Sequence, residues 1–105
     1  MTGWTALWLL VAAAGATAQD APPRPGKIGL CVACHGEDGR GRTPETPHIG
    51  GQQDGYLRAA LAAYRDGTRA DAAMNAIAGS LSAADIDAFA RWYAQQRWPA
   101  TPASP

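Results

Sequence analysis

The chain has 105 residues, a length that suits one small domain. Nine Lys and Arg balance nine Asp and Glu, so the formal net charge at neutral pH is zero. Nucleic-acid binding requires a basic surface, and we therefore expect no nucleic-acid partner.

Residues 1–18 have the character of an export signal. The run from Trp4 to Ala14 is apolar and uncharged, and Ala16-Thr17-Ala18 supplies the small-x-small pattern of a signal-peptidase site. We predict cleavage after Ala18 and a periplasmic location. A retained anchor is the alternative, although the stretch is shorter than the roughly 20 residues that span a bilayer.

Two proline-containing segments flank the predicted domain, residues 26–98. Residues 19–25 form a Pro-rich lead and residues 99–105 a Pro/Ala tail, and both are expected to be disordered. An apolar core alone is marginal in a domain of this size, so we expect further stabilisation from a bound group.

The segment Cys31-Val32-Ala33-Cys34-His35 carries the most specific chemistry in the chain. A C-x-x-C-H run is the attachment signature of a c-type haem, in which both thiols form thioether bonds and the imidazole binds the iron. Residues i and i+3 share one side of a helix, so both sulfurs reach one porphyrin edge. A redox-active dithiol, the competing interpretation, prefers a βαβ setting and does not need His35. One covalent haem c is predicted.

Three helices are expected, and no segment alternates at period 2, so the domain is predicted to be all-α. The first covers 26–34, with Pro25 in its first turn, and stops near Gly36 before a Gly/Pro-rich loop. The second covers 54–66, with Asp54 as N-cap. Its apolar face consists of Leu57, Ala60, Leu61 and Tyr64, and Gly67 is its C-terminal stop.

The third predicted helix begins after Ser82, where Ser82 and Asp85 have the spacing of a capping box. Its apolar positions repeat at i, i+3, i+4 and i+7, and Pro99 bars continuation past Trp98. The apolar positions are Ile86, Phe89, Ala90 and Tyr93.

The residue on the other face of the iron decides whether the iron carries electrons or binds a molecule. Met74 is predicted for this position, in a loop expected between Gly67 and Leu81. A methionine opposite a histidine raises the reduction potential of haem iron. There are two alternatives: Met74 only fills the core, or His48 binds the iron in place of Met74.

On these motifs the chain resembles class I cytochromes c, and more narrowly bacterial cytochrome c4 and c553-type single-haem domains. The resemblance covers residues 26 to 97 and includes the following segments: Cys31 to Gly39, Thr46 to Gln52, Tyr56-Leu57 with Leu61, Tyr64 to Arg69, Met74-Asn75, and Leu81 to Ile86. It implies a small fold of three to four helices around the haem.

The resemblance also implies residue roles. It implies thioether bonds at Cys31 and Cys34, with His35 and Met74 as axial iron ligands. It suggests that the Pro47 carbonyl accepts the Nδ1 proton of the ligating histidine, since such a histidine usually has an acceptor that fixes its ring.

Two further contacts are expected around the haem and the first helix. Arg69 is a candidate partner for a haem propionate, as are Tyr64 and Gln52, with a solvated surface charge as the alternative for Arg69. The resemblance also implies that the first and last helices cross, and Gly29 is expected to pack there against Trp92 or Phe89.

The predicted function is one-electron transfer in the periplasm between respiratory or oxidoreductase partners, by a carrier that is not an enzyme. Docking to redox partners should be transient, and membrane-bound respiratory complexes are possible partners. A tightly bound haem subunit of a dehydrogenase or oxidase is one alternative. A ligand-binding haem protein with an open iron site is another.

Overall fold

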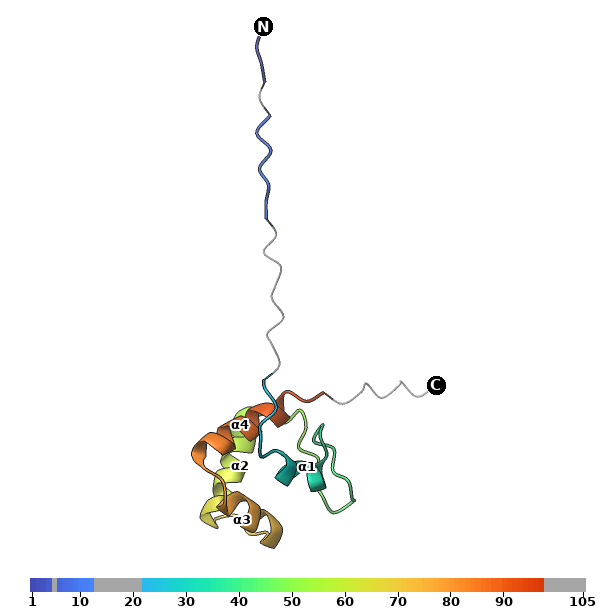
Figure 1. The fold of residues 1–105 in the computed structure, drawn as a ribbon, viewed down its shortest axis with the longest axis vertical. Coiled ribbons are helices and arrows are strands. Elements are labelled where there is room, and N and C mark those ends of the chain that lie inside the picture. Colours follow the sequence, from blue (N-terminus) through green and yellow to red (C-terminus); the bar gives the residue numbers. More distant parts are fainter. Residues whose placement is uncertain (5, 13–21, 98–105) are drawn as a thin grey trace, which may run out of the picture.

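The computed structural model describes residues 1–4, 6–12 and 22–97. Four helices and no strand occur in these ranges, which confirms the all-α prediction. The helices, in chain order, are α1 (Gly29–His35), α2 (Asp54–Asp66), α3 (Ala72–Gly79) and α4 (Ala83–Ala94) (Figure 1).

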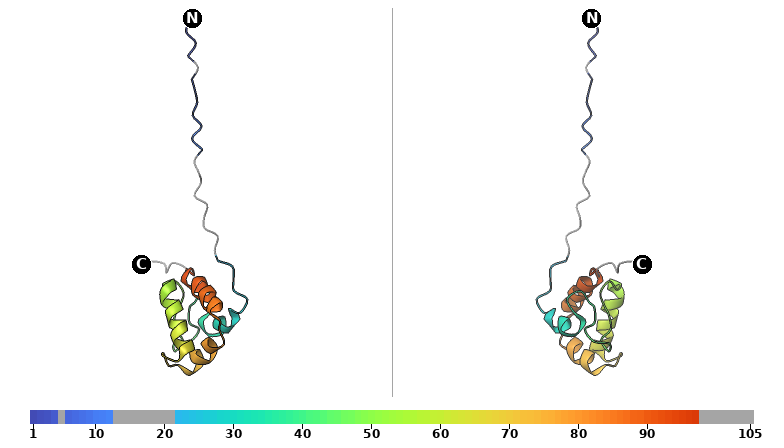
Figure 2. Two further views of the ribbon diagram at one scale, coloured as in Figure 1. Left: turned by 90° about the vertical axis from the view of Figure 1, so that its left-hand side faces the viewer. Right: turned by 90° about the vertical axis from the view of Figure 1, so that its right-hand side faces the viewer.

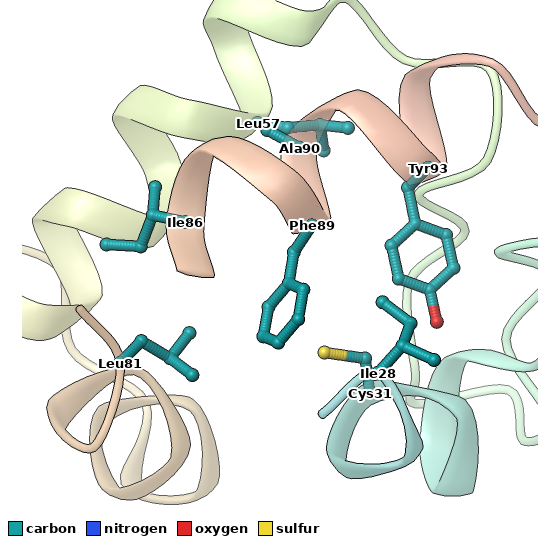
Figure 3. Close-up of a cluster of buried hydrophobic side chains, with 8 residues drawn as sticks. All are labelled: Ile28, Cys31, Leu57, Leu81, Ile86, Phe89, Ala90 and Tyr93. Carbon is teal, nitrogen blue, oxygen red and sulfur yellow. The ribbon is translucent and has the colours of Figure 1, made fainter. Parts of the chain in front are cut away.

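Helix α2 packs against both α3 and α4, and α1 with the loop that follows it forms the other part of the domain (Figures 1 and 2). A small apolar core joins the two parts. Phe89 of α4 points toward Cys31 of α1, with Ile28 and Tyr93 beside them (Figure 3). Ile28 is fully buried and Phe89 is 2% exposed. The core therefore fixes the segment that carries the C-x-x-C-H motif against the C-terminal helix.

Helix α1 begins at Gly29, three residues later than predicted, because residues 25–28 form a turn in which the Ile28 N–H donates to the Pro25 carbonyl at 3.2 Å. The predicted packing of Gly29 against Trp92 or Phe89 is wrong. A Cβ at Gly29 would have no atom within 4 Å, so this glycine is not at a helix crossing. Ile28 and the first cysteine of the motif occupy the core beside α4 instead.

Helix α2 has the predicted bounds, and Gly67 ends it in the left-handed conformation (φ +79°). The predicted N-cap is wrong: Gln53 occupies that position, and no side chain caps the helix. Asp54 is the first helical residue, and its carboxylate pairs with Arg58 one turn later at 2.9 Å. The favourable position of a carboxylate in the first turn explains why the sequence pattern suggested a cap.

The largest departure from the sequence prediction is α3, since Met74 was expected in a loop. Asp71 caps this helix, accepting the Met74 N–H on its carboxylate at 2.9 Å. Alanine, the best helix former, occupies four of the eight positions. The high helix propensity of alanine and the Asp71 cap thus stabilise a helix that lacks a strong apolar face.

Helix α4 confirms the capping box. The Ser82 hydroxyl accepts the Asp85 N–H, the Asp85 carboxylate accepts the Ser82 N–H, and both distances are 3.0 Å. The helix ends at Ala94, before the limit set by Pro99.

The described residues nearest the N-terminus, 1–4 and 6–12, lie outside these helices. Residues 6–12 have no helix or strand and expose their apolar side chains. No helix in the described ranges is long and apolar enough to cross a bilayer. The predicted cleavage site after Ala18 and the predicted tail at 99–105 lie outside the described residues.

Candidate haem site

A cavity of about 370 Å³ is lined by residues of α1, of the loop that follows it and of helices α2, α3 and α4. Its walls are mostly apolar, as a porphyrin-sized pocket requires. All six residues that the sequence analysis assigned to the haem line this one cavity: Cys31, Cys34, His35, Pro47, Arg69 and Met74. They come from α1, from the loop after α1, from the α2–α3 connection and from α3.

Helix α1 presents the two thiols and the imidazole together. Cys31 is buried and Cys34 is exposed, while His35 is 7% exposed at the end of the helix. Burial raises the pKa of the Cys31 thiol to about 11. One sulfur of the motif thus lies against the core, and the other lies at the protein surface.

The imidazole of His35 is held by the loop that follows it. Its Nδ1 lies 2.9 Å from the Pro47 carbonyl oxygen, so Nδ1 carries the proton and Nε2 is free to bind a metal. The Arg42 N–H donates to the Cys34 carbonyl at 2.9 Å, and the Ile49 N–H donates to the Gly39 carbonyl at 2.7 Å. These bonds tie both ends of the loop around the histidine.

Gly39 makes this close return of the chain possible. It has a φ of +79°, and a Cβ there would collide with the backbone of Gly50. Only glycine combines that dihedral angle with that approach.

His48, the alternative iron ligand, lines the same cavity. Its Nδ1 accepts the Gly41 N–H at 2.9 Å. Because Nδ1 accepts this hydrogen bond, the proton of a neutral His48 is on Nε2, and the ring stabilises the loop.

Helix α3 brings Met74 to the cavity. Its side chain is half-buried, and the neighbouring Ile77 also lines the cavity. A thioether in an apolar wall is chemically suited to haem iron.

Arg69 contributes the cation at the cavity. Its guanidinium carbon lies 4.8 Å from the centre of the Tyr64 ring, and one of its nitrogens lies 3.5 Å from the Tyr56 hydroxyl. The two aromatic rings thereby orient this side chain. Gln52, also considered as a propionate partner, lines the same cavity as Tyr64.

The sequence analysis assigned no role to two polar residues near Met74, namely Asp71 and Asn75, although Asn75 is part of the resemblance. Asp71 also lines the cavity, and Asn75 is half-buried with its amide bonded to the backbone. Asp71 could have been found, since an aspartate immediately before an alanine-rich stretch is an N-cap signal. The role of Asn75 had no local signal, because its partners lie in another helix and in the preceding turn.

The residues fit a covalently bound haem. Two thiols share one helix with an imidazole that has its proton acceptor in place, a thioether lies on another helix, and apolar side chains fill the walls between. The described residues contain no cluster of three or more His, Cys, Asp or Glu side chains for a bare metal ion. A small helical domain with this site is a c-type cytochrome.

Comparison with known proteins agrees with this conclusion. The family model for cytochrome c matches residues 12–98. Cytochrome c-554(548) of Halomonas halodenitrificans is 45% identical over 82 residues, covering 75% of this chain and 99% of that protein. Cytochrome c4 of Pseudomonas aeruginosa is 34% identical over 80 residues, covering 76% of this chain and 40% of that protein.

Two further relatives are longer than this chain. The thiosulfate dehydrogenase electron acceptor of Thiomonas intermedia is 35% identical over 100 residues, 90% of this chain and 46% of that protein. The solved structure of Acidithiobacillus ferrooxidans cytochrome c4 superposes with a TM-score of 0.57 at 36% identity, covering 61% of this chain and 37% of that one. The chain thus spans less than half the length of three of these four relatives.

The chain belongs to the cytochrome c family. Its cofactor is covalent haem c, and its activity is electron transfer rather than catalysis. Its partners are therefore other redox proteins.

Proposed function

We propose that the chain is an exported single-haem carrier in which Cys31 and Cys34 form the thioether bonds and His35 and Met74 are the axial ligands. The iron supplies the chemistry by changing between the ferrous and ferric states. In this proposal Pro47 orients the ligating imidazole.

The observation that carries the proposal is the common cavity. Thiols, imidazole and thioether line one cavity although they come from two helices that are far apart in the chain. Two firmly held protein ligands keep the coordination similar in both oxidation states, so little reorganisation accompanies electron transfer. The 2.9 Å bond from His35 Nδ1 to the Pro47 carbonyl supports this, because it prevents rotation of the ring.

Arg69 is proposed as a partner for a haem propionate. Its guanidinium lines the cavity, and its contacts with Tyr56 and Tyr64 direct it there. A cation at this position compensates the negative charge that a propionate brings to the domain.

The proposed location is the periplasm, with residues 1–18 removed as a signal peptide, a lead at residues 19–25, the haem domain at 26–98 and a tail at 99–105. The apolar, uncharged run from Trp4 and the Ala16-Thr17-Ala18 pattern support export. Transient docking to redox proteins, including membrane-bound respiratory complexes, is proposed for the mature carrier. The exposed Cys34 supports this, since a haem bound through it would extend to the protein surface.

The experiment is a redox titration, followed by optical spectroscopy, of protein matured in a periplasm. We expect an intact mass raised by one haem, a weak ferric absorption band at the red end of the spectrum from the iron–thioether bond, and loss of that band in Met74→Ala. Met74→His should lower the reduction potential. His48→Ala is the matched control, because it removes the competing side chain at the same cavity, and it should retain the band.

Two results would contradict the proposal. A mature chain without the added haem mass rules out covalent attachment. A wild-type ferric spectrum that lacks this band, and that changes in His48→Ala but not in Met74→Ala, reverses the choice of ligand.

A further inference from the structure

We propose that Asp71 and Asn75 act as a positioning pair that holds Met74 on the iron. This inference rests on the proposed role of Met74 as axial ligand. It assigns a task to two residues that do not themselves touch the iron.

The pair closes the first turn of α3 with reciprocal hydrogen bonds. The Asp71 carboxylate accepts the Met74 N–H at 2.9 Å. In return, the Asn75 side-chain oxygen accepts the Asp71 N–H, also at 2.9 Å. The Asn75 N–H donates to the Asp71 carbonyl at 2.8 Å. Met74 therefore lies between two residues that are bonded to each other in both directions, and its backbone cannot move without breaking one of these bonds.

The amide of Asn75 also anchors this turn to the rest of the domain. Its nitrogen donates one hydrogen to the Tyr64 carbonyl at 2.8 Å and the other to the Arg69 carbonyl at 2.9 Å. Tyr64 lies in the last turn of α2, and Arg69 lies in the turn that leads to α3. Both donor hydrogens of one half-buried amide are thus used on backbone carbonyls outside α3.

These contacts give the pair a role that an ordinary helix cap lacks. A cap stabilises its own helix, whereas Asn75 fixes α3 relative to α2 and to Arg69, the cation at the same cavity. The pair therefore determines where the Met74 sulfur lies along the cavity wall. Loosening it should weaken the hold of the thioether on the iron more than it weakens the fold.

Imidazole binding to the ferric holoprotein measures this hold, because imidazole must displace the thioether to reach the iron. Asp71→Ala removes the cap, and we expect about fivefold tighter imidazole binding, the size of a typical N-cap loss. Asn75→Ala leaves the cap but removes the bond from the Asp71 N–H and both anchoring bonds, and it should have a larger effect, on the order of tenfold or more. Asp71→Asn keeps an oxygen that accepts the Met74 N–H and should bind imidazole within about twofold of wild type.

Ser82→Ala is the matched control. It removes an equivalent cap, in which the Ser82 hydroxyl accepts the Asp85 N–H at 3.0 Å, but at α4, which carries no proposed iron ligand. It should lower thermal stability about as much as Asp71→Ala while leaving imidazole affinity unchanged. Backbone hydrogen exchange provides a second measurement, and the Met74 amide should exchange faster in Asp71→Ala but not in Ser82→Ala.

Equal imidazole affinity in Asp71→Ala and Ser82→Ala would overturn the positioning role, because the effect would then follow general stability. Failure of the proposed ligand itself gives a different result. In that case Met74→Ala binds imidazole no more tightly than wild type, whereas a correct assignment makes Met74→Ala the tightest binder of the series.

Discussion

Replacing Tyr93 by Phe tests how the last helix is attached to the end of α1, which carries the C-x-x-C-H motif. The Tyr93 hydroxyl donates to the Gly36 carbonyl at 2.9 Å, in a buried bond that joins residues 57 positions apart. Gly36 directly follows the proposed ligand His35. Figure 3 shows the Tyr93 ring pointing from α4 toward α1. Since the phenylalanine ring fills the same space, the substitution removes a hydrogen bond and leaves no cavity.

The expected cost is about 2 kcal/mol, made up of the net value of a hydrogen bond and the penalty for a buried carbonyl left without its donor. For a domain of this size that corresponds to a fall in Tm of roughly 8–16 °C. Thermal unfolding of the ferric holoprotein, followed by circular dichroism, measures it. Tyr56→Phe is the matched control, because Tyr56 is 51% exposed and its hydroxyl has only a long contact with Arg69.

Alkaline pH gives a second measurement on the same residue. Burial raises the pKa of the Tyr93 hydroxyl above its ordinary value of 10. An unfolded chain therefore loses this proton from about pH 10 upward while the folded chain keeps it, so the free energy of unfolding falls as pH rises through that range. Tyr93→Phe lacks this contribution, and the stability gap between wild type and variant should narrow above about pH 10. A Tm within 2 °C of wild type, with no change in that gap, would refute the reasoning.

Two further outcomes are expected. Gly39→Ala should destabilise the domain by at least about 2 kcal/mol, since the φ of Gly39 is +79° and the added Cβ meets the Gly50 backbone. Gly55→Ala is the control and should stabilise α2 slightly, because a Cβ at Gly55 has open space around it. A Gly39→Ala variant as stable as wild type would contradict the described loop. Haem-free chain made in a cytoplasm should be largely unfolded, so iodoacetamide should alkylate Cys31 and Cys34 at similar rates near neutral pH. In the folded domain, burial raises the pKa of the Cys31 thiol to about 11, whereas Cys34 is exposed. A much slower alkylation of Cys31 than of Cys34 would therefore show that the domain folds without its cofactor.

The sequence predicted most reliably those features that depend on neighbouring residues. The bounds of α2 follow from an apolar repeat that ends at Gly67, and the start of α4 follows from the capping pair Ser82 and Asp85. Helix α3 was missed because its alanines give propensity without a clear apolar face. The packing of Gly29 was predicted wrongly because the start of α1 depends on a turn at Pro25 that composition does not define.

The candidate site divides along the same line. The motif at residues 31–35 indicates haem chemistry by itself, because its two thiols and its imidazole lie within five consecutive residues. The role of Pro47 came from the resemblance to a family, since nothing local shows that its carbonyl returns to within 2.9 Å of His35, whereas Arg69 was chosen for its place in the connection that leads to Met74. Asn75 is part of the resemblance, but no role for it could be predicted, because its amide bonds to two carbonyls, 6 and 11 residues away, that only the folded chain brings to it.

This division has a physical cause in the way the small domain is stabilised. Few side chains are fully buried in it, and the cavity takes the place that a larger apolar core would occupy. Polar contacts over long sequence separations, such as Tyr93 to Gly36 and Asn75 to Tyr64, must therefore hold the cavity walls in position. In such a domain the residues that position the ligands also stabilise the fold, so a single substitution affects both roles. The two roles can be separated only by comparison with a variant that loses an equivalent bond elsewhere, such as the Ser82 cap.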